Sequence, residues 1–265
     1  MPSATTTGNP MSIQLQPQAA DLEQWVRLAQ QEHAEFEVMD PFFVTGIGDF
    51  GKHQKTAEQF RKTGMVRSVH GAFIDVNPAS GDPDIRNLSR QRCRESCEIA
   101  SALGAGNLVF HSSAFPFLRG AYLENWAAGC AAFYEELAQQ HPLRICIENA
   151  QDVDPTPLRK LMERIRSDRI GVCLDIGHVH YSRAPVTAWF EELGEWIAYL
   201  HLSDNLGEFD DHVALGKGSI DWDLVHGLWK SLGRDIPITL ETGDLNSTKE
   251  SIRFLREHQY FGLEG

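Results

Sequence analysis

The chain has 265 residues, of which 42% are hydrophobic and 23% are charged, and these values are typical of a soluble globular protein with a core. Lysine and arginine number 24 against 37 aspartates and glutamates, so the net charge is −13, which disfavours a protein whose affinity comes from neutralising DNA phosphates. The sequence contains no run of about 18 apolar residues, so it predicts no membrane span. The five scattered cysteines form no CxxC pair, which favours a reduced, cytoplasmic protein.

Residues 1–11 lack the apolar stretch of a secretory signal, and we expect a short disordered leader or a remnant of expression there. From residue 12 onward, short runs rich in Val, Ile, Leu and Phe alternate with longer segments of helical character. The predicted strands span residues 12–16, 35–42, 66–73, 107–113, 144–150, 170–177, 198–204 and 238–242. The predicted helices span residues 20–33, 54–63, 84–104, 121–140, 155–167, 185–195, 221–232 and 247–258. Eight such units without a linker predict one α/β domain over residues 12–265, a closed (β/α)₈ TIM barrel, with an open doubly wound sheet as the alternative.

Polar residues recur where the predicted strands end. The strand-end set comprises His70, His111, Glu148, Asp175, His201 and Glu241, and His178, Asp210 and His212 lie just beyond strand ends. One histidine in a strand is more often a hydrogen-bonded core residue, but recurrence in six successive strands favours a shared role at one mouth of the barrel. Carboxylates and imidazoles gathered there would repel one another or stay unpaired without a cation. Their oxygen and nitrogen atoms suit Mn²⁺, Mg²⁺, Zn²⁺ or Co²⁺, so the pattern predicts a metal site.

These residues resemble the xylose isomerase-like TIM barrels. That superfamily contains sugar isomerases and epimerases, inosose dehydratases and AP endonucleases of the endonuclease IV type. The resemblance covers roughly residues 12–260 and rests on the segments SVHGAF, VFHSS, CIENA, CLDIGHVH, LHLSDN, DDHVALGKGSIDW and TLET. Epimerases of the superfamily hold one divalent cation with Glu, Asp, His and Glu, which match Glu148, Asp175, His201 and Glu241. The resemblance further implies that the two glutamates act as an acid/base pair.

The endonuclease IV branch uses three zinc ions, and its additional ligands match His70, His111, His178, Asp210 and His212. Sugar-type members also keep the early histidines and the Asp-x-His loop, where these residues bind substrate oxygens. Two departures from the family pattern stand out. Leu206 and Gly207 occupy the place of an epimerase arginine, and Lys217 replaces the glutamate of a Gly-Glu-Gly segment. Lys217 is interpreted either as a cation for a phosphate or carboxylate group or as a solvent-facing loop residue.

The resemblance implies a metal-dependent sugar or sugar-derivative isomerase or epimerase. Proton transfer would pass through an enediolate bound to the cation, with one carboxylate removing the proton and another returning it. We expect Mn²⁺ first, with Zn²⁺, Mg²⁺ or Co²⁺ as alternatives. The alternative functions are an endonuclease IV-like zinc phosphodiesterase acting on abasic DNA, an inosose dehydratase-like lyase, or a non-catalytic barrel. We expect a small sugar as the partner and no nucleic acid or membrane, and a homo-oligomer is compatible with the sequence.

Overall fold

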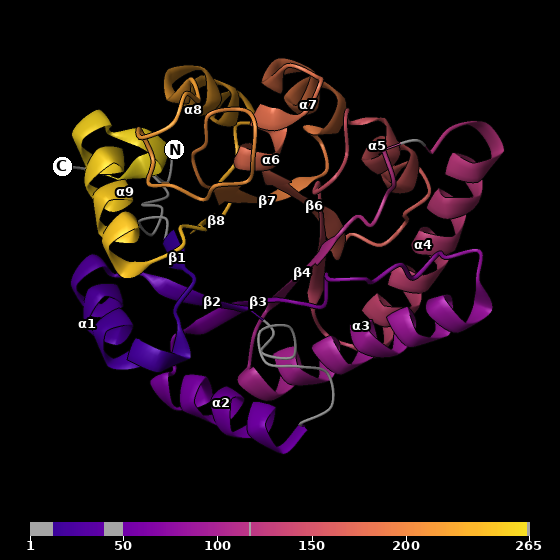
Figure 1. The fold of residues 1–265 in the computed structure, drawn as a ribbon, viewed down its shortest axis with the longest axis horizontal. Coiled ribbons are helices and arrows are strands. Elements are labelled where there is room, and N and C mark those ends of the chain that lie inside the picture. Colours follow the sequence, from indigo (N-terminus) through magenta and orange to yellow (C-terminus); the bar gives the residue numbers. More distant parts are fainter. Residues whose placement is uncertain (1–12, 40–49, 117, 264–265) are drawn as a thin grey trace, which may run out of the picture.

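The computed structural model describes residues 13–39, 50–116 and 118–263, and in these ranges parallel strands β1 to β8 close into a barrel (Figure 1). The strands are β1 (Ile13–Leu15), β2 (Glu35–Met39), β3 (Val66–His70), β4 (Asn107–His111), β5 (Arg144–Glu148), β6 (Ile170–Asp175), β7 (Ile197–Leu202) and β8 (Ile238–Leu240). Each strand pairs with its neighbours in sequence, and pairing of Leu15 with Leu240 closes the barrel between β1 and β8. The (β/α)₈ prediction is therefore confirmed, and the open sheet is wrong.

Helices surround the barrel, as Figure 1 shows. They are α1 (Leu22–Glu32), α2 (Phe50–Thr63), α3 (Pro83–Leu103), α4 (Gly120–Gln140), α5 (Thr156–Met162), α6 (Ile176–Tyr181), α7 (Val186–Leu193), α8 (Trp222–Ser231) and α9 (Leu245–His258). Two 3₁₀ turns, Ala19–Asp21 and Tyr260–Gly262, precede α1 and follow α9. Within the described residues, no helix has the length and apolarity needed to cross a membrane.

The predicted strands extend past the observed ones at their carboxyl ends. The strand predicted over 66–73 ends at His70, and that predicted over 107–113 ends at His111, because strand pairing stops where the loops diverge toward the mouth. The helix predicted over 155–167 ends earlier, at Met162. Residues 1–12 and 40–42, which include the predicted leader and two predicted strand ends, lie outside the described residues.

The strands bury apolar side chains on their outer faces and a mixed set inside the barrel. Helix-facing side chains such as Leu15, Phe36 and Leu200 are fully buried in the main core. A separate small cluster comprises Val109, Cys146, Cys173 and Tyr199. Cys146 and Cys173 precede Glu148 and Asp175 by two residues, and side chains two apart on a strand share a face. The cluster therefore lies directly beneath the polar strand ends.

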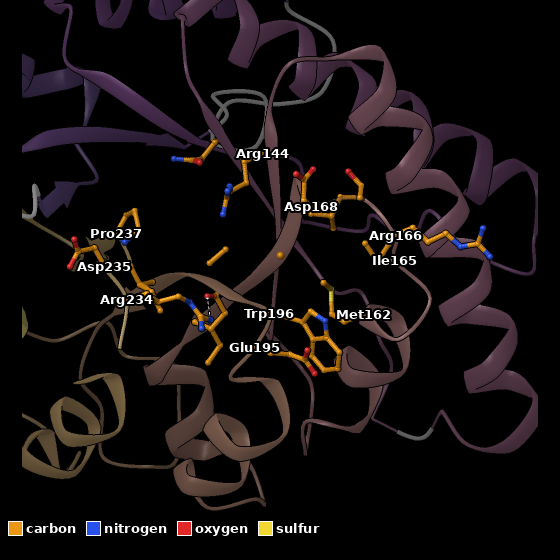
Figure 2. Close-up of a pocket in the computed structure, with 17 residues that line it drawn as sticks. Arg144, Met162, Ile165, Arg166, Asp168, Glu195, Trp196, Arg234, Asp235 and Pro237 are labelled. Atoms are coloured by element: carbon orange, nitrogen blue, oxygen red, sulfur yellow. Dashed lines mark hydrogen bonds between the residues drawn. The ribbon is translucent and has the colours of Figure 1, made fainter. Parts of the chain in front are cut away.

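A hollow of about 580 Å³ lies at the amino ends of the later strands (Figure 2). Its lining includes Arg144, Asp168, Trp196 and Arg234, and the Arg234 guanidinium donates to the carbonyl oxygen of Ile197 at 2.9 Å. Arg144 begins β5, whereas Glu148 ends it. The hollow is therefore at the opposite end of the barrel from the predicted site, at the face that in this fold contributes to stability rather than catalysis.

Candidate metal centre

Four residues from consecutive strand ends converge at the mouth of the barrel. Glu148 and Asp175 end β5 and β6, His201 lies in β7, and Glu241 follows β8. All four are buried, and their ligand atoms lie within 4.8 Å of one another. His201 Nδ1 lies 2.8 Å from Glu241 Oε2 and 3.4 Å from Glu148 Oε2. We call Glu148, Asp175, His201 and Glu241 the quartet.

The junction of β6 and α6 fixes Asp175. The strand continues into the helix without a connecting loop, and Asp175 is the N-cap, since its Oδ1 accepts a hydrogen bond from the His178 backbone N–H at 2.6 Å. Asn149 binds the Asp175 backbone on both sides, with its Oδ1 accepting at 2.8 Å and its Nδ2 donating at 3.0 Å. A Cβ at Gly177 would lie 2.4 Å from Ser203 Oγ, so only glycine permits this close packing. Helix α6 was not predicted, because residues 170–177 resemble one strand.

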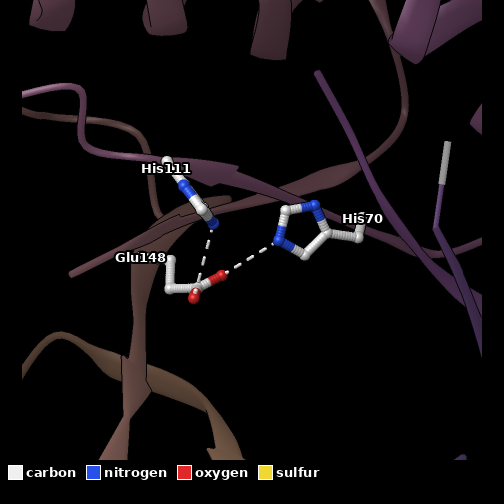
Figure 3. A group of neighbouring side chains, drawn as sticks. All are labelled: His70, His111 and Glu148. Carbon is white, nitrogen blue, oxygen red and sulfur yellow. Dashed lines mark ion pairs between the residues drawn. The ribbon is translucent and has the colours of Figure 1, made fainter. Parts of the chain in front are cut away.

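A second group of ligand atoms surrounds Glu148 on the side of β3 and β4 (Figure 3). His70 Nε2 lies 3.3 Å from Glu148 Oε2, and His111 Nε2 lies 3.7 Å from Oε1. His70 is buried, whereas His111 also lines a groove of about 630 Å³ with Phe73, Leu88 and Phe115. The groove gives the candidate centre an apolar extension between the loops that follow β3 and β4.

A third group lies on the side of β6 and β7. His178 Nε2 and His212 Nε2 lie 3.1 and 3.0 Å from the same oxygen, Asp210 Oδ2. His178 Nδ1 is also 3.2 Å from Glu148 Oε1. Glu148 therefore contacts histidines of both flanking groups, and nine of the ten predicted site residues lie in one connected cluster.

Lys217 is the predicted site residue that the structure places elsewhere. Its side chain is exposed, and its Nζ lies 3.7 Å from Glu250 Oε2 on α9. That contact is on the outer side of the loop after β7, so the placement matches the solvent-facing interpretation of Lys217.

Hydrogen bonds to backbone carbonyls orient three of the cluster histidines. Their Nδ1 atoms lie near backbone carbonyl oxygens: His70 near Gly71 (3.0 Å), His178 near Asn149 (2.6 Å) and His212 near Glu241 (2.8 Å). In the neutral ring, donation of Nδ1–H to a carbonyl leaves the lone pair on Nε2, the nitrogen that faces Glu148 or Asp210. This arrangement is typical of metal-ligating histidines.

Five buried atoms of the quartet make no hydrogen bond of good geometry to any described residue: both oxygens of Glu148, Asp175 Oδ2, Glu241 Oε2 and His201 Nδ1. Histidine nitrogens do lie 2.8–3.4 Å from the glutamate oxygens, as ion-pair contacts that carry charge only when the rings are protonated. An unsatisfied buried polar atom is costly, and five of them facing one another are more so. Three carboxylates and one imidazole nitrogen are a ligand set that suits a divalent cation such as Mn²⁺ or Zn²⁺. The residues present therefore fit a metal ion.

The pKa values show how strongly the cluster requires positive charge. Burial raises the pKa of Asp175 to about 6. Burial opposes ionisation of Glu241 as well, but His201 lowers its pKa to about 2. Despite burial, neighbouring Asp210 and Glu241 raise the pKa of His212 to about 10. Burial also opposes charge on His178, yet Asp175 raises its pKa well above the usual value. In the protein alone, protons on histidines thus supply the positive charge that a cation would provide.

Three buried carboxylates in or near the cluster were not predicted from the sequence: Glu37, Asp152 and Asp204. Glu37 Oε1 lies 3.1 Å from His201 Nε2. Asp152 accepts a hydrogen bond from Ser112 Oγ at 2.5 Å beside the mouth. Asp204 accepts hydrogen bonds from Gly216 N and Trp222 Nε1, both at 2.9 Å, and so holds the loop with Asp210 and His212. Glu37 alternates with Phe36 and Val38 in EFEVM, a pattern that does not indicate burial.

The model of the family described as "Xylose isomerase-like TIM barrel" matches residues 14–258. Protein MJ1311 of Methanocaldococcus jannaschii is 28% identical over 202 residues, which are 72% of this chain and 69% of MJ1311. Protein MJ1614 of the same organism is 26% identical over 162 residues, which are 59% of this chain and 62% of MJ1614. A probable endonuclease 4 of Chlorobium phaeovibrioides is 30% identical over 70% of this chain and 74% of its own length.

The solved structures that share the fold include two with 23–24% sequence identity. The TTHB071 protein from Thermus thermophilus, soaked with ZnCl₂, has a TM-score of 0.75 at 24% identity and covers 93% of this chain and 97% of its own. A D-tagatose 3-epimerase-like protein has a TM-score of 0.65 at 23% identity, and the match covers 91% of this chain and 82% of that protein's chain. At these identities the likeness concerns the barrel itself.

Proposed function

Because the chain belongs to the xylose isomerase-like TIM barrel family, we propose that it is a divalent-metal-dependent isomerase or epimerase of a sugar or sugar derivative. The main support is the quartet, four buried ligands from consecutive strand ends with their unsatisfied atoms facing one another. Similarity in fold to a D-tagatose 3-epimerase-like protein is consistent with this substrate class. The resemblance of the motifs to epimerases makes Mn²⁺ the first expectation for the metal.

Glu148, Asp175, His201 and Glu241 would hold the cation. When bound, a divalent cation supplies Lewis acidity, which lowers the pKa of a proton next to a substrate carbonyl and stabilises the resulting charge. The carboxylates of Glu148, Asp175 and Glu241 can hold this ion and also face the substrate. We assign the quartet both tasks, binding for all four and proton transfer for its two glutamates.

Glu148 and Glu241 are suited to proton transfer by position and by charge. They come from β5 and β8, with Asp175 and His201 between them, so they reach the substrate from different directions. The positive histidines hold the pKa of both glutamates below the usual value despite burial, so both are ionised near neutral pH. One removes the proton. The other takes up a proton from water and delivers it to the neighbouring carbon or to the opposite face, and the first glutamate releases its proton to water, so the charges balance.

In this proposal His70, His111, His178, Asp210 and His212 bind substrate oxygens. Their ring nitrogens and the Asp210 carboxylate lie around Glu148 and the mouth, where a polyhydroxylated molecule would lie. The apolar groove next to His111 would take the part of the substrate without hydroxyl groups. A dehydratase-like lyase would use the same residues and differ only in losing a β-hydroxyl group.

A second function is favoured by one specific observation. The two flanking groups, His70–His111–Glu148 and His178–Asp210–His212, have the composition of further metal sites, and relatives of this chain include probable endonuclease 4 proteins. A three-zinc phosphodiesterase acting on abasic DNA would use all nine residues. The net charge of −13 opposes tight binding to DNA, so we rank this function second.

Metal content and two activity assays distinguish the functions. The protein should be purified without added metal, analysed for elements, and then assayed with a panel of ketoses in D₂O and with an abasic duplex. One ion per chain together with deuterium incorporation at a substrate carbon supports the isomerase. Three zinc ions per chain together with incision of the duplex would reverse the ranking, and a protein without bound or bindable metal would contradict both.

A further inference from the structure

Glu37 is a carboxylate inside the barrel that has no place in the quartet. It lies on β2 and is fully buried. Its Oε1 and Oε2 lie 3.1 and 3.2 Å from the same atom, His201 Nε2. Among the described residues, the groups of ligand atoms within 4.8 Å of one another do not include Glu37. Its contact is therefore with the far side of a ligand ring and not with the candidate metal position.

Neighbouring donors hold the Glu37 carboxylate in place. Gln16 Nε2 donates to Oε1 at 2.9 Å, and Thr239 Oγ1 donates to Oε2 at 3.4 Å. The hydroxyl group of Tyr199 in turn lies 2.7 Å from Thr239 Oγ1. Each Glu37 oxygen thus has a donor in addition to His201, so the carboxylate presents a fixed acceptor to the imidazole.

This geometry determines which nitrogen of His201 is available to a metal. An Nε2–H that donates to Glu37 leaves the lone pair on Nδ1, and Nδ1 is the atom that faces Glu148 and Glu241. The other oriented histidines of the cluster use backbone carbonyls, which no side-chain substitution removes. His201 depends on a side chain, and a carboxylate is the stronger acceptor.

We propose that Glu37 is a positioning residue that sets the tautomer and the ring orientation of His201 for metal binding through Nδ1. The inference rests on the proposed metal-dependent function and adds a residue that acts on the quartet from outside it. Partners of this kind typically change metal affinity by about 10–100-fold when they are removed.

The test compares Glu37→Gln with Ser68→Ala. Ser68 is the control because it is fully buried in the same barrel interior and lies 3.1 Å from Tyr199 OH and 3.2 Å from Asn107 Nδ2, and its link to Glu37 runs only through Tyr199 and Thr239. Both changes are made in the full chain that also carries His111→Ala and Asp210→Ala, which removes one ligand from each flanking group. Zn²⁺ affinity is then measured by competition with a chromophoric chelator. We expect about 10–100-fold weaker binding for Glu37→Gln and nearly unchanged binding for Ser68→Ala.

A spectroscopic measurement on the unaltered protein does not depend on how the variant folds. With ¹⁵N-histidine labelling and Zn²⁺ bound, His201 should show a proton on Nε2 and coordination through Nδ1, its signals being identified by their loss in His201→Gln. The opposite tautomer, or unchanged Zn²⁺ affinity in Glu37→Gln, would overturn the positioning role alone. If the unaltered protein does not bind Zn²⁺, the metal function is overturned instead, and this inference with it.

Discussion

His178 Nε2 and Asp210 Oδ2 lie 3.1 Å apart, and their contact joins α6 to the loop between β7 and α8. His212 reaches the same oxygen from within the loop, at 3.0 Å. The loop can hold this position because the buried Asp204 carboxylate anchors the end of the loop that leads into α8, where it accepts hydrogen bonds from Gly216 N and Trp222 Nε1. One side of the candidate centre therefore depends on a buried residue that does not face the mouth.

Replacing Asp204 should release that loop. Asp204→Ala leaves several buried donors without an acceptor, so we expect a loss of about 3 kcal/mol or more in the free energy of unfolding, measured with urea. Asp211→Ala is the control, since Asp211 is exposed in the same loop. Similar stability losses in the two variants would show that Asp204 is not the anchor.

The close packing at Gly218 gives a second prediction. A Cβ at this position would lie 2.2 Å from both Asn205 O and Asp204 Oδ1, whereas a Cβ at Gly227, inside α8, would have no neighbour within 4 Å. Gly218→Ala should therefore destabilise the protein, and Gly227→Ala should stabilise it by about 0.5–1 kcal/mol through helix propensity. Thermal unfolding of both variants checks the signs, and stabilisation of both would be inconsistent with the packing at Gly218.

The quartet should divide into bases and ligands. Glu148→Gln and Glu241→Gln keep an oxygen but remove the base, so proton exchange at the substrate carbon should fall about 10²–10⁴-fold while metal remains bound. Asp175→Ala and His201→Ala should lose the metal and, with it, the exchange. Elemental analysis and deuterium incorporation are measured on all four variants. Normal exchange in both glutamine variants would exclude the two-glutamate mechanism even with an intact metal site.

Asp152 should make stability depend on pH. Burial raises its pKa from 3.8 to about 6, so the folded protein binds more protons than the unfolded chain between these values, and stability falls as pH rises through this range. Asp152→Asn removes the buried charge. We expect it to gain about 3 kcal/mol over the parent at pH 7–8 and little at pH 4, as measured by urea unfolding.

Ser112 provides a complementary variant for this prediction. Its hydroxyl group donates to Asp152 Oδ2 at 2.5 Å and stabilises the ionised form. Ser112→Ala should therefore raise the pKa of Asp152 further and extend the loss of stability to higher pH. Stability curves of the parent and Asp152→Asn that stay parallel from pH 4 to 8 would rule out the assigned pKa.

Positions at strand ends could be predicted from the sequence because barrel topology converts a one-dimensional register into proximity. Each of Glu148, Asp175 and His201 sits at or near the end of an apolar run, and parallel strands bring such ends to one mouth. Convergence of the quartet therefore required only the correct fold. The structure adds the distances and the orientation of each ring.

Glu37 could not be predicted in the same way. It alternates with Phe36 and Val38, which is also the pattern of a strand with one face in water. Only closure of the barrel turns that face inward, toward a histidine 164 positions further along the chain. Helix α6 escaped prediction for a different reason: its six residues directly follow β6 and include Gly177, a residue with low helix propensity.

The direct junction between β6 and α6 limits how this barrel can be diversified. Enzymes of this fold acquire new substrates largely by lengthening or exchanging the loops at the mouth. An insertion after Asp175 would separate the strand end from the cap that fixes its carboxylate, so this junction offers no place for a grafted segment. Libraries that seek a new substrate range should keep residues 170–181 constant and vary the segments after β3 and β4, which form the walls of the apolar groove.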